Sequence, residues 1–205
     1  MATEPTDGVY ELLCRGDPNA FDRIRAYLTA DGTLVDTGLP NTIDTLLAEI
    51  EAVGVDPGRV VITHMHGDHI GGIEAVLDGY DADLFLPVGA DSDETPPVDH
   101  FYGEGDTVGP FEAVHVPGHV GHQHALIATD DDYAILADAL SGADQRGFSG
   151  GFHLPPGKFT QDLGQAEQSL ETFLEYEFDT GLVFHGSNVL SGASEHIERY
   201  VLPAE

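Results

Sequence analysis

The chain has 205 residues, of which 37 are acidic and 7 are basic, and its formal net charge is −30. A nucleic-acid-binding protein needs lysine and arginine to displace counterions from phosphates, so this composition argues against a nucleic-acid partner. The length fits one domain, and we expect a single domain over 1–205, without an internal repeat or linker.

The charge imbalance also bears on the solvent in which the protein works. Self-repulsion of this size destabilises a compact state, and molar salt relieves it by shortening the Debye length to about 3 Å. The chain has a single lysine, Lys158. We therefore expect a halophilic source with a salt-rich cytoplasm, and we interpret acidic runs such as 130–132 as solvated faces rather than metal sites.

No feature of the chain predicts a membrane or secretory protein. The opening residues 1–7 lack the basic region and apolar core of a signal peptide, and no apolar segment approaches the roughly 20 residues of a membrane span. The single cysteine, Cys14, cannot form an internal disulfide, and we expect it to be buried in an early strand. The expectation is a soluble cytoplasmic protein whose partner is a small-molecule substrate. The oligomeric state stays open.

The predicted elements begin with a hairpin, in which 26–28 and 33–35 flank a tight turn at Asp31-Gly32. A helix follows, with apolar residues at i, i+3, i+4 and i+7 and Gly54 as its stop signal: Ile43, Leu46, Leu47 and Ile50. Strands are predicted at 83–86 and 125–128 and helices at 165–175 and 193–201. In the first of these two helices we expect four buried residues: Ala166, Leu170, Phe173 and Leu174.

The stretch HMHGDH at 64–69 packs three imidazoles and a carboxylate into six residues, directly after the apolar run 60–62. Alternate side chains of an extended segment share a face, so His64 and His66 can point into one metal position. The two ligands after the turn can aim at a second position, which suits a pair of metals roughly 3.5–4 Å apart. Imidazole and carboxylate are ligands for zinc, and also for iron or manganese. The alternative is a histidine-rich surface turn.

Three further candidate ligands stand at the ends of later apolar runs: His119, Asp138 and His185. Side chains delivered from the ends of separate strands can converge on one rim of a sheet. With the first cluster they make seven candidates. The alternative of a surface turn does not account for them.

This order of motifs resembles the metallo-β-lactamase fold superfamily of hydrolases, whose pattern is a His-x-His-x-Asp-His loop, a later His, a bridging Asp and a final His. The resemblance covers nearly the whole chain and includes 36–38, which is similar to the family's early Asp-x-Gly turn. It implies an α/β fold, a four-layer αββα sandwich of two mixed β-sheets flanked by helices. The hydrophobic pattern alone gives only mixed α/β.

Carried over residue by residue, the resemblance implies two Zn²⁺ ions, with iron or manganese as alternatives. The resemblance gives the first metal the ligands His64, His66 and His119. It gives the second metal the ligands Asp68, His69 and His185. Asp138 would bridge the two metals. Asp68 and Asp138 are also the candidate catalytic residues. In such sites a hydroxide held between the metals is the nucleophile, because coordination lowers the pKa of water.

Four other residues are candidates for supporting or substrate-contacting roles: Asp36, His122, Phe148 and His153. Asp36 could accept a hydrogen bond from the ligand loop or from a ligand imidazole, or could simply cap a turn. His122 stands where this chain is one residue shorter than its relatives, either at the site edge or packed into its loop. The other two lie in the glycine-rich segment 141–158, which we expect to be a loop and either a substrate wall or an ordinary surface loop. The segment 87–105, with Phe101 and Tyr102, is a weaker candidate for a second wall.

The bridging Asp138 makes the chain resemble the glyoxalase II and lactonase branches more than true β-lactamases. The leading hypothesis is therefore hydrolysis of a small carboxylic ester, thioester or lactone. The first alternative is a mononuclear non-haem iron dioxygenase acting on a sulfur substrate. The others are β-lactam hydrolysis, as a main or side activity, and a metal-binding protein without catalysis.

Overall fold

The computed structural model describes residues 2–15, 23–93 and 95–202, and it consists of two compact units, Met1–Tyr102 and Gly103–Glu205. The boundary falls directly after the strand β7 (His100–Tyr102). Each unit contains one large mixed sheet with helices packed on it.

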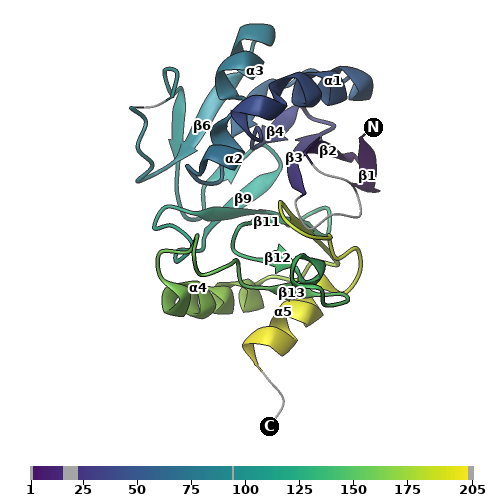
Figure 1. Ribbon diagram of the computed structural model, residues 1–205, viewed down its shortest axis with the longest axis vertical. Helices are drawn as coiled ribbons and strands as arrows, with labels where there is room; N and C mark the ends of the chain where they lie inside the picture. Colours follow the sequence, from purple (N-terminus) through teal and green to yellow (C-terminus); the bar gives the residue numbers. More distant parts are fainter. Residues whose placement is uncertain (1, 16–22, 94, 203–205) are drawn as a thin grey trace. The chain divides into compact units, whose positions relative to one another are not determined.

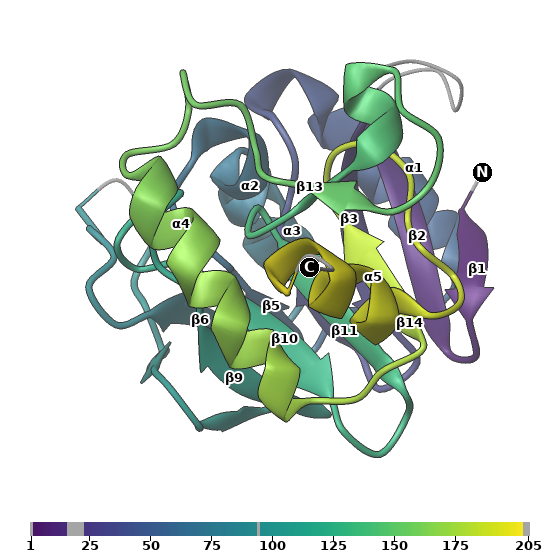
Figure 2. The ribbon, with the colours of Figure 1, turned by 90° about the horizontal axis from the view of Figure 1, so that it is seen from below.

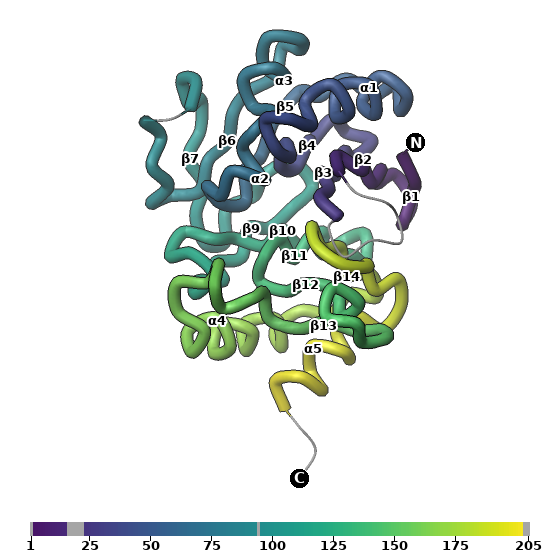
Figure 3. The backbone as a smooth tube through the Cα atoms, viewed as in Figure 1, coloured from purple at the N-terminus to yellow at the C-terminus, as the bar shows by residue number. Residues whose placement is uncertain are grey.

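The first unit is built on a seven-stranded sheet in which the strands stand in sequence order, so β1 and β7 form its two edges (Figures 1 and 3). The pairs from β1 to β4 are antiparallel, and the pairs from β4 to β7 are parallel. The strands before β7 are β1 Thr3–Thr6, β2 Val9–Arg15, β3 Ile24–Thr29, β4 Thr33–Val35, β5 Arg59–Val61 and β6 Asp83–Pro87.

Helices α1 (Ile43–Val53) and α3 (Ile73–Gly79) bury one apolar face each in the core of this unit. In α1, Leu46 and Ile50 lie one turn apart and share one face, as the spacing predicted. The helix ends at Gly54, whose φ of 76° is a left-handed conformation that glycine adopts without steric cost. A 3₁₀ turn, η1 (Pro40–Thr42), precedes α1, and the short helix α2 (Gly67–Ile70) precedes α3.

The second unit is built on a five-stranded sheet in the order β14-β11-β10-β9-β8, accompanied by a two-stranded ribbon of β12 and β13. The β11–β14 pair is parallel, and the other pairs are antiparallel. The strands are β8 Thr107–Val108, β9 Phe111–His115, β10 His124–Ala128, β11 Tyr133–Ala137, β12 Ser141–Gly142, β13 Phe152–His153 and β14 Thr180–Val183.

Helices α4 (Leu163–Ser169) and α5 (Ala193–Val201) lie over the strands β9, β10 and β11 (Figure 2). The 3₁₀ helix η3 (Leu170–Glu175) continues α4, and a second 3₁₀ helix, η2 (Ala143–Arg146), lies between β12 and β13. One apolar cluster joins helix residues such as Leu170 and Ile197 to strand residues such as Val114 and Leu136. The two mixed sheets with their flanking helices confirm the predicted α/β class.

Most predicted elements are present, including the 26–35 hairpin and the helices at 43–53 and 193–201. The helix predicted over 165–175 is partly wrong: it begins at Leu163 and becomes the 3₁₀ helix η3 from Leu170. Leu174, predicted to be buried, is 41% exposed. With three residues per turn, Phe173 comes back under Leu170 and Leu174 is turned away from that face.

The structure tests two further predictions, one on Cys14 and one on the segment 141–158. Cys14 is buried in β2, and burial raises the pKa of its thiol to about 12, so it stays protonated at neutral pH. The segment 141–158, predicted to be an unstructured loop, contains β12, η2 and β13. Within the part of the chain that the structure describes, no helix is long and apolar enough to cross a membrane.

Candidate metal centre

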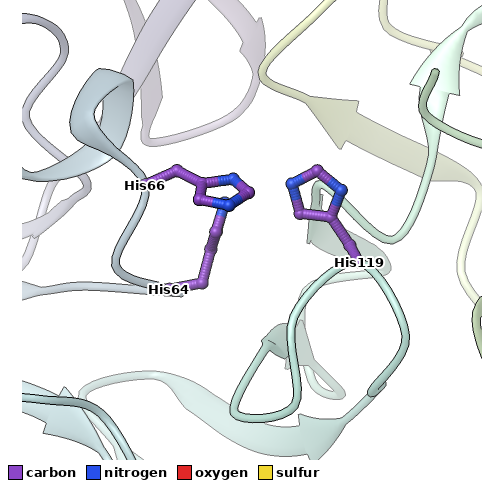
Figure 4. A group of neighbouring side chains, drawn as sticks. All are labelled: His64, His66 and His119. Atoms are coloured by element: carbon purple, nitrogen blue, oxygen red, sulfur yellow. The ribbon is translucent and has the colours of Figure 1, made fainter. Parts of the chain in front are cut away.

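The loop after β5 carries four of the predicted ligands within the first unit. His64 is buried and His66 is half-buried, and their ring centroids lie 4.8 Å apart (Figure 4). His69 follows on α2, and its ring centroid is 4.0 Å from that of His64. The carboxylate of Asp68 is 4.0 Å from His69 Nε2. The turn into α2 therefore gathers three imidazoles and a carboxylate.

Asp36, the residue after β4, connects this loop to the sheet. Its carboxylate is fully buried and accepts three hydrogen bonds, from the backbone N–H of Thr63 (2.8 Å), the hydroxyl of Thr63 (2.7 Å) and Nδ1 of His69 (2.5 Å). Burial raises the pKa of Asp36, while His69 and the bonds from Thr63 act in the opposite direction. The predicted contact with a ligand imidazole is present, and Asp36 is more than a turn cap.

The hydrogen bonds around Asp36 determine which nitrogen of each ring carries the proton. A carboxylate only accepts, so His69 donates from Nδ1 and its Nε2 keeps a lone pair. The hydroxyl of Thr63 gives its proton to Asp36, and its oxygen therefore accepts from Nδ1 of His64, 3.2 Å away. Both imidazoles thus present Nε2 as a potential metal ligand.

Thr37 and Thr63 are functional candidates that the sequence analysis missed. The backbone N–H and hydroxyl of Thr37 both donate to the carbonyl of His69, at 2.7 and 2.8 Å, and the hydroxyl accepts from the N–H of Gly72. These bonds hold the backbone of the ligand-bearing helix α2. A threonine beside a strand carries no sequence signal of such a role, because β-branched residues are common there.

In the second unit, Asp138 directly follows β11, where the register with β14 shifts between Ile135 and Ala137. Ala137 has a φ of 50°, in the left-handed region that residues other than glycine rarely adopt. Irregularities of this kind re-aim the following side chain. Here they direct Asp138 away from the regular course of the strand.

Asp138 lies between the other two predicted ligands of this unit. One carboxylate oxygen, Oδ2, is 3.3 Å from Nε2 of His119 and 3.5 Å from Nε2 of His185. His119, also labelled in Figure 4, lies on the turn after β9, and His185 lies two residues beyond β14. Nδ1 of His119 is bonded to Thr160, 3.2 Å away, so this ring too presents Nε2.

The loop that carries His185 is anchored by its own set of contacts. The carbonyl of His185 accepts from the N–H of Gly142 (2.8 Å), and Asp144 accepts from both the N–H and the hydroxyl of Ser187, each at 2.6 Å. A Cβ on Gly142 would lie 2.2 Å from the nitrogen of Ser187, so only glycine fits at this approach. The sequence analysis missed Asp144. Its carboxylate accepts hydrogen bonds from the N–H and hydroxyl of Ser187, just as the carboxylate of Asp36 accepts them from Thr63.

The donor atoms in each unit fit a divalent metal. Neutral imidazoles with outward Nε2 lone pairs and partly exposed or shared carboxylates are the ligands that zinc takes in hydrolytic sites. A hydrogen-bonding partner behind Nδ1 is the arrangement typical of metal-binding histidines. His64, His69 and His119 all have it.

Comparison with known families agrees with this donor set. The sequence model of the metallo-beta-lactamase superfamily matches residues 26–185, a range that contains all seven predicted ligands. The chain belongs to this superfamily. The predicted resemblance is confirmed, and the superfamily is one of metal-dependent hydrolases.

Two curated relatives and one solved structure illustrate its place among superfamily members. A hydroxyacylglutathione hydrolase of Xanthomonas euvesicatoria is 35% identical over 129 residues, which are 59% of this chain and 48% of that protein. The chain thus spans about half the length of that relative. The lactamase-like protein aptB of Emericella nidulans is 25% identical over 98% of this chain and 63% of that protein. A beta-lactamase domain protein from Burkholderia ambifaria matches with a TM-score of 0.72 and 23% identity over 97% of this chain and 74% of its own.

The structure also places the predicted substrate-contacting residues of this superfamily member. Phe148 is 66% exposed, on the segment after η2. His153 is buried on β13, where its Nδ1 donates to the carbonyl of Leu154 and burial lowers its pKa. The carbonyl of the half-buried His122 accepts from Nδ1 of His124. Their contacts with a substrate stay predictions.

The two aromatic residues of the second predicted wall, Phe101 and Tyr102, differ in their exposure to solvent. Phe101 is 54% exposed, whereas Tyr102 is 2% exposed and its hydroxyl donates to the carbonyl of Ile62, at 2.7 Å. Adjacent residues of a strand face opposite sides, so these two aromatic rings cannot line one wall. Tyr102 instead holds the strand end that leads into the ligand loop.

Proposed function

We propose that this protein is a dinuclear zinc hydrolase that cleaves a small carboxylic ester, thioester or lactone. The observation that carries the proposal is the position of Asp138 between two histidines, because a carboxylate that can serve two metals is the feature that the resemblance assigns to the glyoxalase II and lactonase branches. The name of the Xanthomonas relative, a hydroxyacylglutathione hydrolase, supports an acyl substrate.

By the resemblance to the family, His64, His66 and His119 would hold the first metal, Asp68, His69 and His185 would hold the second, and Asp138 would be shared by both. When bound, the metals would supply a water of lowered pKa as the nucleophile and polarise the acyl carbonyl. The protein's own residues would orient the ligand imidazoles, transfer the proton and position the water.

The buried Asp36 and Thr63 hold His64 and His69 in the tautomer that leaves Nε2 available. Asp68, whose side chain is 29% exposed, is accessible enough to accept a proton from solvent-derived water and return it to the leaving group. Asp138, whose side chain is 6% exposed, would orient the attacking water by hydrogen bonding from a fixed position. These two carboxylates are therefore the proposed catalytic residues.

The test measures hydrolysis by purified protein in molar KCl against a panel of nitrophenyl esters, acyl thioesters, lactones and β-lactams. We expect turnover of one of the first three classes, loss of turnover after chelation, and its return with Zn²⁺. His185→Ala should strongly lower turnover and zinc content.

A matched control is His100→Ala, because His100 lies on the edge strand β7 with its side chain 52% exposed. This variant should behave as wild type. Iron-dependent consumption of oxygen with a sulfur substrate, and unchanged metal content in His185→Ala, would contradict the proposal and indicate a mononuclear oxygenase.

A further inference from the structure

The segment 156–166, which leads into α4 and forms its first turn, is fastened to the turn that carries His119. The N–H of Gln161 donates to the carbonyl of His119 (3.0 Å), and the N–H of Asp162 donates to the carbonyl of Gly118 (2.9 Å). The contact is close, since a Cβ on Gly118 would lie 2.1 Å from the nitrogen of Ala166. The segment and the ligand turn are therefore held together by direct backbone contacts.

Thr160 makes a side-chain hydrogen bond between this segment and the imidazole of His119. Its Oγ1 is 3.2 Å from Nδ1 of His119 and 3.2 Å from the carbonyl oxygen of Pro156. A carbonyl only accepts, so the hydroxyl proton goes to Pro156. The oxygen then accepts from His119, which must carry its proton on Nδ1. Nε2, which is 3.3 Å from Oδ2 of Asp138, is then the nitrogen available to a metal.

We propose that Thr160 is a positioning residue that holds His119 in the Nδ1–H tautomer and in the ring orientation that a metal requires. The inference rests on the proposed function, because it assigns His119 to the first metal. His119 is 2% exposed, so bulk water does not substitute readily for the hydroxyl. The same arrangement recurs in the first unit, where Thr63 gives its proton to Asp36 and accepts from His64.

The decisive variant is Thr160→Val, which keeps the shape of the side chain and removes the acceptor. Loss of such a partner typically weakens metal binding about 10–100-fold, and we expect a zinc Kd raised by that factor in a chelator competition. Thr160→Ser keeps the hydroxyl and should restore the wild-type Kd. Thr172→Val, on the half-buried Thr172 of η3, is the control for replacing a threonine by valine and should leave zinc affinity unchanged.

A second readout is independent of bound metal. In ¹⁵N spectra of zinc-free protein, with His119 assigned by comparison with His119→Gln, wild type and Thr160→Ser should keep a proton on Nδ1, whether or not Nε2 also carries one beside Asp138. Thr160→Val should lose that proton from Nδ1 in part or in full, with a shift towards the Nε2–H tautomer. Wild-type zinc affinity together with an unchanged tautomer in Thr160→Val would overturn the inference. If wild type binds zinc but hydrolyses no acyl substrate, only the proposed function fails.

Discussion

Replacing Asp36 by Asn removes one negative charge from the centre of the first unit without changing the shape of the side chain. All three groups that face the carboxylate are donors: the N–H and hydroxyl of Thr63 and Nδ1 of His69. An amide offers one oxygen and one NH₂ group. At least one buried donor must therefore face another donor.

The cost follows from which donor is left facing the NH₂ group. If the NH₂ group faces the N–H of Thr63, that buried donor stays unsatisfied at a cost of about 1–3 kcal/mol. If it faces His69, the proton of the ring can move to Nε2, and that nitrogen can no longer bind a metal. According to the orientation of the amide, we therefore expect either the free energy of unfolding to fall by about 1–3 kcal/mol or the zinc affinity of the second-metal set to fall about 10–100-fold.

The measurements are denaturant unfolding of zinc-free protein and zinc competition titration, both in molar KCl. Asp36 has a φ of 57°, and asparagine tolerates this conformation well, so backbone strain does not confound the comparison. Asp132→Asn is the matched control, since Asp132 is exposed and has a φ of 59°. Wild-type stability and zinc affinity in Asp36→Asn would refute the assignment of Asp36 as the residue that orients His69.

Two further predictions concern pH and salt. Burial lowers the pKa of His124 to about 4, from 6.5, so its contribution to stability is complete above pH 6.5 and is lost as the pH falls towards 4. Between pH 7 and pH 5 wild type should lose about 2 kcal/mol more than His124→Gln in paired unfolding curves, and parallel curves would show that this histidine is not responsible. Because carboxylate repulsion is screened only by salt, lowering KCl from molar to about 10 mM should lower the melting temperature, and a constant Tm would exclude the halophilic interpretation.

Sequence reasoning succeeded where a function is encoded locally. The 64–69 motif brings its predicted ligands together through one strand end and one helical turn, and of the four apolar residues in the α1 pattern Leu46 and Ile50 are buried while Ile43 and Leu47 are half-buried. Asp36 was accessible to the same reasoning, because strand ends deliver polar residues to the rim of a sheet. The 64–69 and α1 inferences used the periodicity of strands and helices, whereas Asp36 was singled out by the resemblance of 36–38 to the family's early turn.

The residues that sequence reasoning missed act across long separations. Thr160 is 41 positions from His119, and Asp144 is 43 positions from Ser187. Neither has a local pattern, since threonine and aspartate in loops most often serve turns. Tyr102 was misplaced because an aromatic pair does not reveal which of its members faces the core. Leu174 was misplaced because helical periodicity does not reveal the tighter 3₁₀ turn.

The most direct test of the account is the metal stoichiometry of wild type and Asp138→Ala, measured by mass spectrometry on protein dialysed against zinc in molar KCl. Removing the proposed bridging carboxylate would leave two cations with less compensating charge, so the second should be lost first. We predict two zinc ions per wild-type chain and one or fewer in a folded Asp138→Ala variant. Two tightly bound zinc ions in both proteins, or a single iron in wild type, would contradict the dinuclear site.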